Sequence, residues 1–552
     1  MDWNQVLYTA LGVLVFIIVL SLIVLIHEGG HYLVAKKSGI LCHEFSIGMG
    51  PLIYQFKKGE TMFSIRAIPF GGYVAMAGEE VEFDVLKDVK KVKVIIENGI
   101  ITKIIVNLDN PKYKDLPVYK LVSYDLSGTL EAHEDELYME LEDEAGEVKR
   151  YTVNRAAMLN AEKKEEIQIA PKNRTFAYKP FWNRFFSVLA GPLMNFVLAV
   201  IVFFVSGVLF GYPNTESTKV AEVSGGAQIV GIENGDTILE IAGTKLENWN
   251  DLTVVLDGVA KGENITADGK VMVKYFDESD NAEKTAYVNP QVYVLSVDML
   301  IENPVDNPNH DVVIADIGEN FSKSKIGAAG LLPGDKIVKL SNSNNTVDIT
   351  GIDTLLKFFA VTHTDASEII FTVSRKDESG NYNDVEVTLK DPFSHDMLDA
   401  SGYVPTRVTM GVSTSMERDF VKSLYMPWVE TGDAALQIFK TLGLFFKKNS
   451  GVKLTDLSGP VGILNLFTQL VQGENALQNI LYWTGLLSVN IGLVNLFPLP
   501  ALDGGRLAFL GYEGVTRKRP TPKVENTIHN IGFILLMGLF VVVLVSDIIK
   551  CF

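Results

Sequence analysis

The chain has 552 residues, a formal net charge of −18 and an apolar fraction of 47%. This length allows three to five domains, and the apolar fraction excludes a chain that is disordered throughout. The acidic balance argues against a nucleic-acid-binding protein, which needs a basic surface. Two cysteines, Cys42 and Cys551, cannot form a disulfide framework.

Four segments are long and uncharged enough to span a bilayer, which requires about 20 apolar residues. They are residues 6–26, 185–212, 476–502 and 531–545. The first lacks the basic start and the cleavage site of a signal peptide, so we interpret it as an anchor. A soluble protein with very apolar core helices is the alternative, but four such segments rarely occur in one soluble fold.

The positions of lysine and arginine predict the orientation in the membrane. These residues lie after the first segment, before the second, and between the third and the fourth, so those loops are expected in the cytoplasm. The loop between the second and third segments then faces outward, as do both termini. Its residues 213–410 hold 32 acidic and 15 basic side chains, which is compatible with the outer side.

A metal-binding pattern, His27-Glu28-Gly29-Gly30-His31, stands at the end of the first segment. On a helix, positions i and i+4 share one face, so both imidazoles can reach one ion while Glu28 activates water. Two structural histidines that match by chance are the alternative. Three ionisable residues within one turn at membrane depth are costly without a shared role, so we predict one Zn²⁺ per chain.

A catalytic zinc site needs a third protein ligand, and Asp503 is the only carboxylate near the end of the third segment. The first and third segments run in the same direction, so their ends reach the same, cytoplasmic, leaflet. A turn or helix cap before Gly504 and Gly505 is the alternative role for Asp503.

Pro498 and Pro500 interrupt the helix just before Asp503. Irregular backbone at membrane depth is tolerated only where protein covers it or where it lines a cavity, so this stretch is predicted to line the active site. Asn490 and Asn495 can grip an extended peptide or form hydrogen bonds between helices. Both roles stay open for Asn490, and the site is favoured for Asn495.

These motifs together resemble the site-2 protease family (M50-type), and within it the bacterial RseP-like intramembrane zinc metalloproteases. Further matches cover both membrane halves: Phe45-Ser-Ile-Gly-Met-Gly-Pro51, Pro69-Phe-Gly-Gly-Tyr-Val74, Ala190-Gly-Pro-Leu-Met-Asn195 and Ser458-Gly-Pro-Val-Gly-Ile463. The resemblance implies an endopeptidase that cuts transmembrane segments of single-span membrane proteins. Implied substrates are anti-sigma factors, remnant signal peptides and pheromone precursors. The alternative is a catalytically silent membrane scaffold that holds client proteins.

The resemblance also implies roles for individual residues. His27, His31 and Asp503 would bind zinc, Glu28 would be the general base, and Asn495 and Asn490 would contact the substrate backbone. The stretch from Pro69 to Val74 would form an edge in the membrane that pairs with unwound substrate, with Gly71 and Gly72 allowing close approach. Gly29 departs from the family, which usually has a larger residue there, and each glycine weakens a helix by about 1 kcal/mol.

Two segments of the outward loop, residues 226–241 and 327–340, share a Gly-Asp turn followed by a short alternating strand. They resemble PDZ domains and match the tandem that the family carries outside the cytoplasm. PDZ folds bind peptides by strand addition, and in the family they are thought to gate access by the size of the substrate ectodomain. The alternative is a pair of β-rich spacers that bind no peptide.

The expected fold is a polytopic α-helical membrane protein with about four spans, tandem extracytoplasmic PDZ-like domains and a cytoplasmic β-rich insert. Residues 92–100 and 138–153 of the insert read as hairpins, and residues 424–447 as an interfacial amphipathic helix. The predicted organisation is 1–81 for the first span and a membrane-associated strand region, 82–180 for the insert, 181–212 for the second span, 213–300 and 301–410 for the PDZ-like domains, 411–475 for the amphipathic helix and a linker, and 476–552 for the last two spans.

Overall fold

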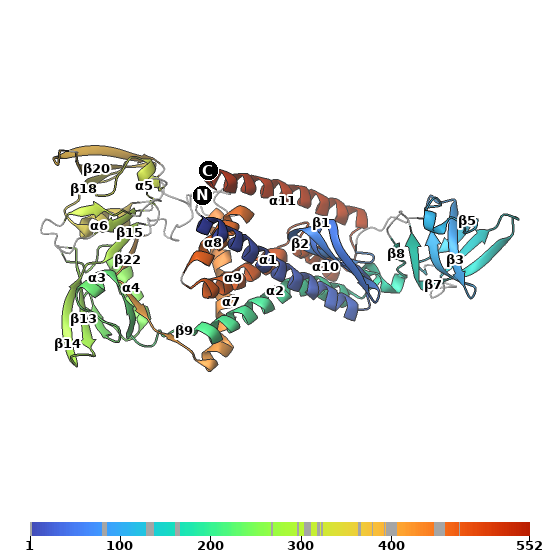
Figure 1. The fold of residues 1–552 in the computed structure, drawn as a ribbon, viewed down its shortest axis with the longest axis horizontal. Helices are drawn as coiled ribbons and strands as arrows, with labels where there is room; N and C mark the ends of the chain where they lie inside the picture. Colours follow the sequence, from blue (N-terminus) through green and yellow to red (C-terminus); the bar gives the residue numbers. More distant parts are fainter. Residues whose placement is uncertain are drawn as a thin grey trace. The chain divides into compact units, whose positions relative to one another are not determined.

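The computed structural model describes residues 3–79, 86–128, 137–160, 166–266, 269–294, 297, 299–302, 311–316, 321, 324–362, 366–377, 379–390, 392, 406–446, 459–473 and 475–551. The chain forms two compact units (Figure 1). The first comprises Met1–Val205, Met426–Ala435 and Ser458–Phe552, and the second comprises Ser206–Tyr425 and Leu436–Leu457.

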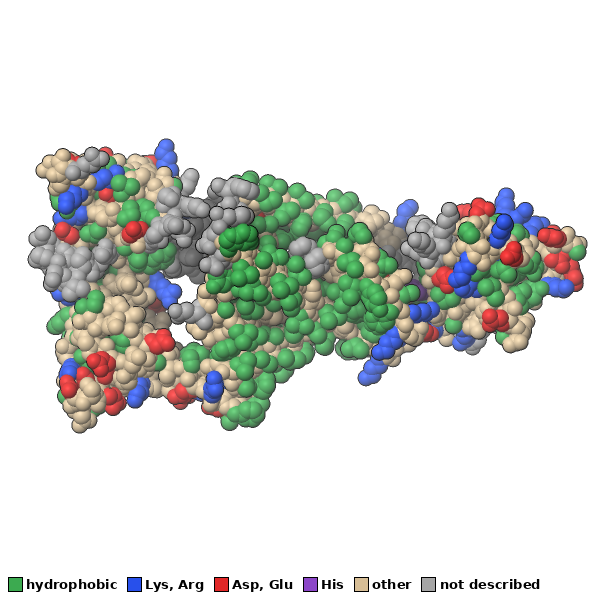
Figure 2. Space-filling view, in the orientation of Figure 1, with side chains coloured by type: hydrophobic (Ala, Val, Ile, Leu, Met, Phe, Trp, Pro, Cys, Tyr) green, Lys and Arg blue, Asp and Glu red, His purple; other side chains and the backbone are tan. Residues whose placement is uncertain are grey.

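Long apolar helices dominate the first unit. They are α1 (Trp3–Lys37), α2 (Phe181–Phe210), α8 (Pro460–Gln472), α9 (Ala476–Leu496), α10 (Asp503–Thr516) and α11 (Pro522–Cys551). Apolar side chains cover most of the face of these helices that Figure 2 shows. A surface of this kind is stable against lipid rather than water, which agrees with the membrane location predicted from the sequence.

Among the described helices, three are long and apolar enough to cross a membrane: Val6–Lys37, Phe181–Phe210 and Lys523–Ile549. They correspond to the first, second and fourth predicted spans. The third predicted span is α9, whose 21 residues include the amides Gln478, Asn479, Asn490 and Asn495. These amides lower its hydropathy, so the count of four spans stays a prediction. The helix also ends at Leu496, earlier than predicted, because two prolines follow.

The helices pack around a shared apolar core. Phe16, Val19 and Ile23 of α1 are buried with Leu198 and Val202 of α2 and with Phe467 of α8. The α8 helix lies within the predicted linker, and the sequence analysis did not anticipate it. Its N-terminus is held by the buried Asp547 of α11, whose carboxylate accepts a 2.8 Å hydrogen bond from the Gly462 amide. A carboxylate there complements the positive end of the helix dipole.

Two strands follow α1 and form one small sheet. β1 (Cys42–Lys58) and β2 (Thr61–Met76) pair antiparallel, and both are folded back, because Phe45 pairs with Phe63 and also with Val74. The last part of β2, residues 72–76, pairs with β1 on one side only among the described strands, so it is a sheet edge. The stretch predicted as strand-like, Pro69 to Val74, lies in this strand.

The insert forms a closed barrel of its own. Its strands are β3 (Lys91–Glu97), β4 (Ile100–Ile105), β5 (Val118–Asp125), β6 (Tyr138–Glu142), β7 (Val148–Asn160) and β8 (Glu166–Gln168). The two predicted hairpins are β3–β4 and β6–β7. β4 also pairs with β7 in parallel, which closes the ring of strands around a buried core that includes Val92, Ile101 and Met139.

The second unit is rich in β-strands. Its strands are β9 (Tyr212–Pro213), β10 (Val220–Val223), β11 (Thr237–Ile241), β12 (Thr244–Lys245), β13 (Val271–Asp277), β14 (Ala282–Val288), β15 (Gln291–Val294), β16 (Met299–Glu302), β17 (Val312–Ile314), β18 (Lys336–Ser341), β19 (Thr346–Asp348), β20 (Glu368–Lys376), β21 (Tyr382–Lys390), β22 (Thr406–Thr409), β23 (Val412–Thr414) and β24 (Met416–Glu417). Its helices are α3 (Gly225–Ile229), α4 (Trp249–Val259), α5 (Lys325–Ala328) and α6 (Ile352–Val361). The next helix, α7 (Phe420–Phe446), covers nearly all of the predicted amphipathic helix, residues 424–447.

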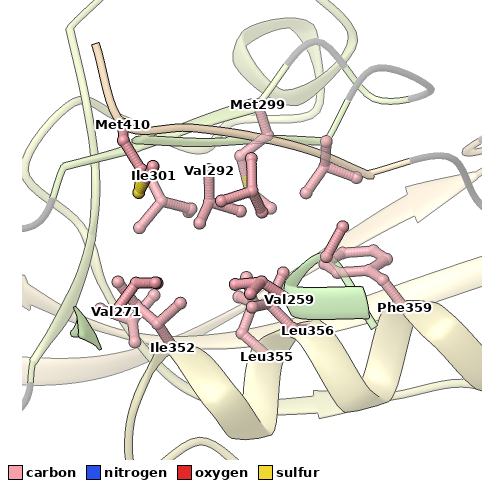
Figure 3. Close-up of a cluster of buried hydrophobic side chains, with 14 of the residues drawn as sticks. Val259, Val271, Val292, Met299, Ile301, Ile352, Leu355, Leu356, Phe359 and Met410 are labelled. Atoms are coloured by element: carbon pink, nitrogen blue, oxygen red, sulfur yellow. The ribbon is translucent and has the colours of Figure 1, made fainter. Parts of the chain in front are cut away.

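The two predicted PDZ-like segments occupy different sheets of this unit. One sheet has the strand order β12-β11-β13-β14, and the larger sheet has the order β21-β20-β18-β17-β16-β15-β22, with β19 beside β18. Figure 3 shows Val292, Met299 and Ile301 facing Leu355 and Leu356 of α6 across the buried core. Both segments therefore contribute to one buried apolar cluster, so they share a single hydrophobic core and are not two independently packed domains.

Candidate metal centre

Three ligand atoms converge where α1 and α10 meet. His27 and His31 lie one turn apart on α1 and are both buried, and Asp503 is the first residue of α10. Asp503 Oδ2 lies 3.1 Å from His27 Nε2 and 3.3 Å from His31 Nε2. The two Nε2 atoms lie 3.2 Å apart. The break after α9 turns the chain so that Asp503 faces the histidines.

These distances match the size of a zinc ion. Zinc bonds to imidazole nitrogen and carboxylate oxygen measure about 2.0–2.1 Å, and tetrahedral angles then place the ligand atoms about 3.3–3.4 Å apart. The three observed distances, 3.1, 3.2 and 3.3 Å, fit that geometry closely. The donor set of two imidazoles and one carboxylate leaves a fourth position open, as catalytic zinc sites require.

The second nitrogen of each histidine has a partner on α2. His31 Nδ1 donates to the Ser187 carbonyl at 2.8 Å, which leaves Nε2 free to bind a metal. His27 Nδ1 lies 3.2 Å from the Asn195 side-chain amide, whose Oδ1 is buried without a hydrogen-bond partner. A metal-binding Nε2 on His27 requires the proton on Nδ1, and Asn195 Oδ1 accepts this proton when the amide nitrogen and oxygen are exchanged.

Electrostatics favours the ionised form of Asp503. The residue stands in the first turn of α10, where the helix dipole stabilises a negative charge. The carboxylate is therefore in the form that binds a cation.

The three ligand atoms open into a cavity of about 780 Å³. Among the residues predicted from the sequence, Glu28, Gly71, Gly72 and Asn495 line this cavity together with His27, His31 and Asp503. Asn490, five residues earlier on α9, is exposed and lies outside the described cavity lining. The remaining lining comes from α1, β1, β2, α2, α9, α10 and the segments after β2 and before α10. These residues are Val24, His43, Met49, Tyr73, Val74, Ala75, Met76, Gly78, Glu79, Val188, Ile491, Ala501, Leu502 and Arg506.

Two glycines bring the walls of the cavity close to the reactive groups. A Cβ atom at Gly72 would lie 2.7 Å from the Ser46 carbonyl oxygen and 3.1 Å from Glu28 Cγ, so the edge strand sits directly against Glu28. A Cβ atom at Gly191 would collide with the imidazole of His31. Any larger residue at either position must displace a neighbour that belongs to the site.

Sequence reasoning assigned no role at the metal centre to Ser187, Gly191, Asn195 or Arg506, although Gly191 and Asn195 lie in the matched stretch from Ala190 to Asn195. Asn195 gave a further signal, since it is an amide within a long apolar segment, and such residues usually meet a polar partner. Ser187 contributes only its backbone carbonyl, which any residue type supplies, so its side chain holds no information about the contact.

The fold and the site define a membrane-embedded metallopeptidase, with an HExxH helix completed by a carboxylate from a distant helix. A family model described as Peptidase family M50 matches residues 15–539, so the chain belongs to that family. The chain is 28% identical to zinc metalloprotease RasP of Shouchella clausii over 98% of its own length and 99% of that protein. It is 30% identical to RasP of Oceanobacillus iheyensis, again over 98% and 99%.

A further relative is the regulator of sigma-W protease RasP of Bacillus subtilis, 28% identical over 98% of this chain and 99% of that protein. These findings confirm the resemblance to RseP-like site-2 proteases and the zinc cofactor. The protein is a zinc metalloendopeptidase of the site-2 protease type in a bacterial plasma membrane, and regulated intramembrane proteolysis is its class of process. The alternative of a silent scaffold is therefore set aside.

Proposed function

We propose that this peptidase cuts transmembrane segments of single-span membrane proteins, with His27, His31 and Asp503 holding zinc and Glu28 acting as general base. The observation that carries the proposal is the set of three ligand atoms 3.1 to 3.3 Å apart at the end of an apolar helix. A site at this depth can reach peptide bonds that soluble proteases cannot.

The roles of the residues follow from their places in the cavity. The chemistry that zinc supplies at such a site is Lewis-acid catalysis, which polarises the scissile carbonyl and acidifies the attacking water. Glu28 accepts the proton of that water and delivers it to the leaving amine. Ser187 and Asn195 hold the two imidazoles in the tautomer that keeps each Nε2 free.

The edge of β2 is the proposed binding site for unwound substrate. Residues 72–76 offer backbone groups on the side away from β1, and an extended peptide can pair with them by strand addition. Gly72 keeps this edge close to Glu28, and Gly71 and Asn495 line the same cavity. Asn490 stays a proposed contact to the substrate backbone, at a position that lies outside the described cavity lining.

The proposed substrates are anti-sigma factors, remnant signal peptides and pheromone precursors. Support for the first class comes from the Bacillus subtilis relative, which is named as a regulator of sigma-W protease. The second unit lies between the two membrane halves in sequence, and we assign to its PDZ-like segments the exclusion of substrates with large ectodomains. Peptide binding by strand addition to these segments belongs to the same proposal.

The experiment is cleavage of a single-span model substrate by the purified protein in detergent, with zinc content measured alongside. Glu28→Gln is expected to keep one zinc per chain. Its cleavage rate is expected to fall about 10²–10⁴-fold, because the substitution removes only the proton transfer. His27→Ala is expected to lose zinc and cleavage together. His43→Ala serves as the matched control for zinc content, since this histidine lines the cavity outside the three-atom group.

Each outcome has a clear meaning. Full cleavage by Glu28→Gln would overturn the assignment of the base, and full zinc content in His27→Ala would overturn the ligand set. A second substrate that carries a large folded ectodomain tests the proposed exclusion by the second unit. Equal cleavage of both substrates in membranes would contradict that part.

A further inference from the structure

The two walls of the catalytic cavity are joined by an ion pair. Glu79 follows β2 after a short turn, and Arg506 lies in the first turn of α10, where Arg506 Nη1 contacts Glu79 Oε1. Both residues line the cavity that contains Glu28 and Asp503. The side chain of Glu79 is only 10% exposed, so the pair is shielded from water and its attraction is stronger than at a surface.

Arg506 stands at an unfavourable place for a cation. The positive end of the α10 dipole lies at its N-terminus, where an arginine is destabilising. Its side chain is about two-thirds buried, and a buried cation needs a partner of opposite charge. Glu28 and Glu525 also act on its charge, but Glu79 makes the direct contact. Helix stability therefore does not account for this residue, whereas its pairing across the cavity does.

Hydrogen bonds hold the backbone just before Glu79. The Ala77 amide donates to the Leu41 carbonyl at 2.8 Å, and the Phe176 amide donates to the Ala77 carbonyl at 2.7 Å. The edge strand, residues 72–76, ends immediately before this segment. On the other side, Asp503 precedes Arg506 by one helical turn. The ion pair therefore connects the end of the edge strand to the helix that presents the carboxylate ligand.

We infer that Glu79 and Arg506 are positioning residues that set the register of bound substrate against the zinc ligands. The inference rests on the proposed function. A strand rises about 3.3 Å per residue, so a displacement of the edge by about that length relative to Asp503 presents a neighbouring peptide bond to the site. The pair thus determines which bond of an added strand is cut, while Glu28 and the zinc ligands determine whether cutting occurs.

The test maps cleavage positions by mass spectrometry and measures kcat and KM with the single-span substrate. The variants are Glu79→Gln, Arg506→Gln, Arg506→Lys and the charge exchange Glu79→Arg with Arg506→Glu. The two glutamine variants are expected to keep zinc, to spread cleavage over adjacent bonds and to lower kcat by up to about 10²-fold, which is the typical cost of a misplacement near 1 Å. The charge exchange and Arg506→Lys are expected to restore a single main cleavage position.

Glu166→Gln is the matched control, because it breaks a partly buried ion pair with Lys103 in the insert, away from the cavity. It is expected to leave the cleavage pattern unchanged. One unchanged cleavage position in both glutamine variants, with wild-type kcat, would overturn the inference. Failure of the charge exchange to restore the pattern, with zinc content and thermal unfolding as in the single variants, would also overturn it. If wild type and Glu28→Gln behave alike, the proposed function itself fails.

Discussion

Asn195 shows how one buried amide can prepare a metal ligand. Its side chain is completely buried on α2 and meets His27 Nδ1, and its Oδ1 needs a donor. A metal-binding Nε2 on His27 requires the ring proton on Nδ1, and Asn195 Oδ1 is the acceptor that this proton needs. That arrangement leaves His27 Nε2 without a proton and directed toward Asp503.

Asn195 variants test this arrangement. Asn195→Leu is expected to weaken zinc binding about 10–100-fold, because the partner that orients His27 is lost. Asn195→Asp keeps an acceptor and is expected to retain most of the zinc affinity. Ser488→Ala is the control, since the Ser488 hydroxyl donates to the backbone carbonyl of Asn195, at 2.8 Å, and not to its side-chain amide. Zinc titration with a competing chelator measures the affinities, and equal affinity for all variants would contradict the proposed role.

At the scale of elements, the contact between α1 and α2 orients the two histidines of the metal centre. Gly30 permits this contact, because a Cβ atom there would collide with the Ala190 carbonyl oxygen and lie 2.9 Å from Met194 Cγ. Gly29 is different, since a Cβ atom there would have nothing within 4 Å. The larger residue that the family usually carries at position 29 therefore has room in this fold, and the glycine pair leaves α1 continuous to Lys37.

The two glycines make a matched pair of alanine substitutions. Gly29→Ala is expected to raise the midpoint of thermal unfolding, because alanine favours a helix over glycine by about 1 kcal/mol. Gly30→Ala is expected to lower the midpoint and the zinc content, because α1 must move away from α2. Thermal unfolding in detergent with zinc analysis measures both. Stabilisation by Gly30→Ala would contradict the close contact at this position.

At the scale of the whole molecule, the first helix, α1, and the last helix, α11, both contact α8. Gly12, near the start of α1, is in close contact with Thr468 of α8, and Asp547, near the end of α11, binds the start of that helix. The start of α1 and the end of α11 therefore lie at the same end of the helical part of the first unit. The expected orientation, in which the termini and residues 213–410 face outward and the insert faces the cytoplasm, stays a prediction.

Single cysteines test the topology in a variant without Cys42 and Cys551. Glu216→Cys lies in the predicted outward loop and Glu147→Cys lies in the insert, and both glutamates are well exposed. A membrane-impermeant maleimide is expected to label Glu216→Cys in intact cells and Glu147→Cys only after lysis. Labelling of both positions in lysed cells is the control. Labelling of Glu147→Cys in intact cells would reverse the proposed orientation.

The sequence by itself determined the protein's class and most of its candidate site. Spans, hairpins and the HExxH pattern depend on residues that are near one another along the chain, and local periodicity records such relations directly. Asp503 could also be predicted as a ligand from the sequence, because the directions of two predicted spans placed it in the same leaflet as His31. The boundaries of α9 and the helix α8 were missed, since amides and a short helix leave a weak signal in hydropathy.

Only the tertiary structure decided how distant residues complete the site. The partners of His27 and His31 come from α2, and Glu79 meets Arg506 across 427 residues of sequence. The closing pair of the insert barrel, β4 with β7, is likewise a long-range and parallel contact. Such contacts depend on how helices and strands pack in space, and no local pattern of residues encodes that packing.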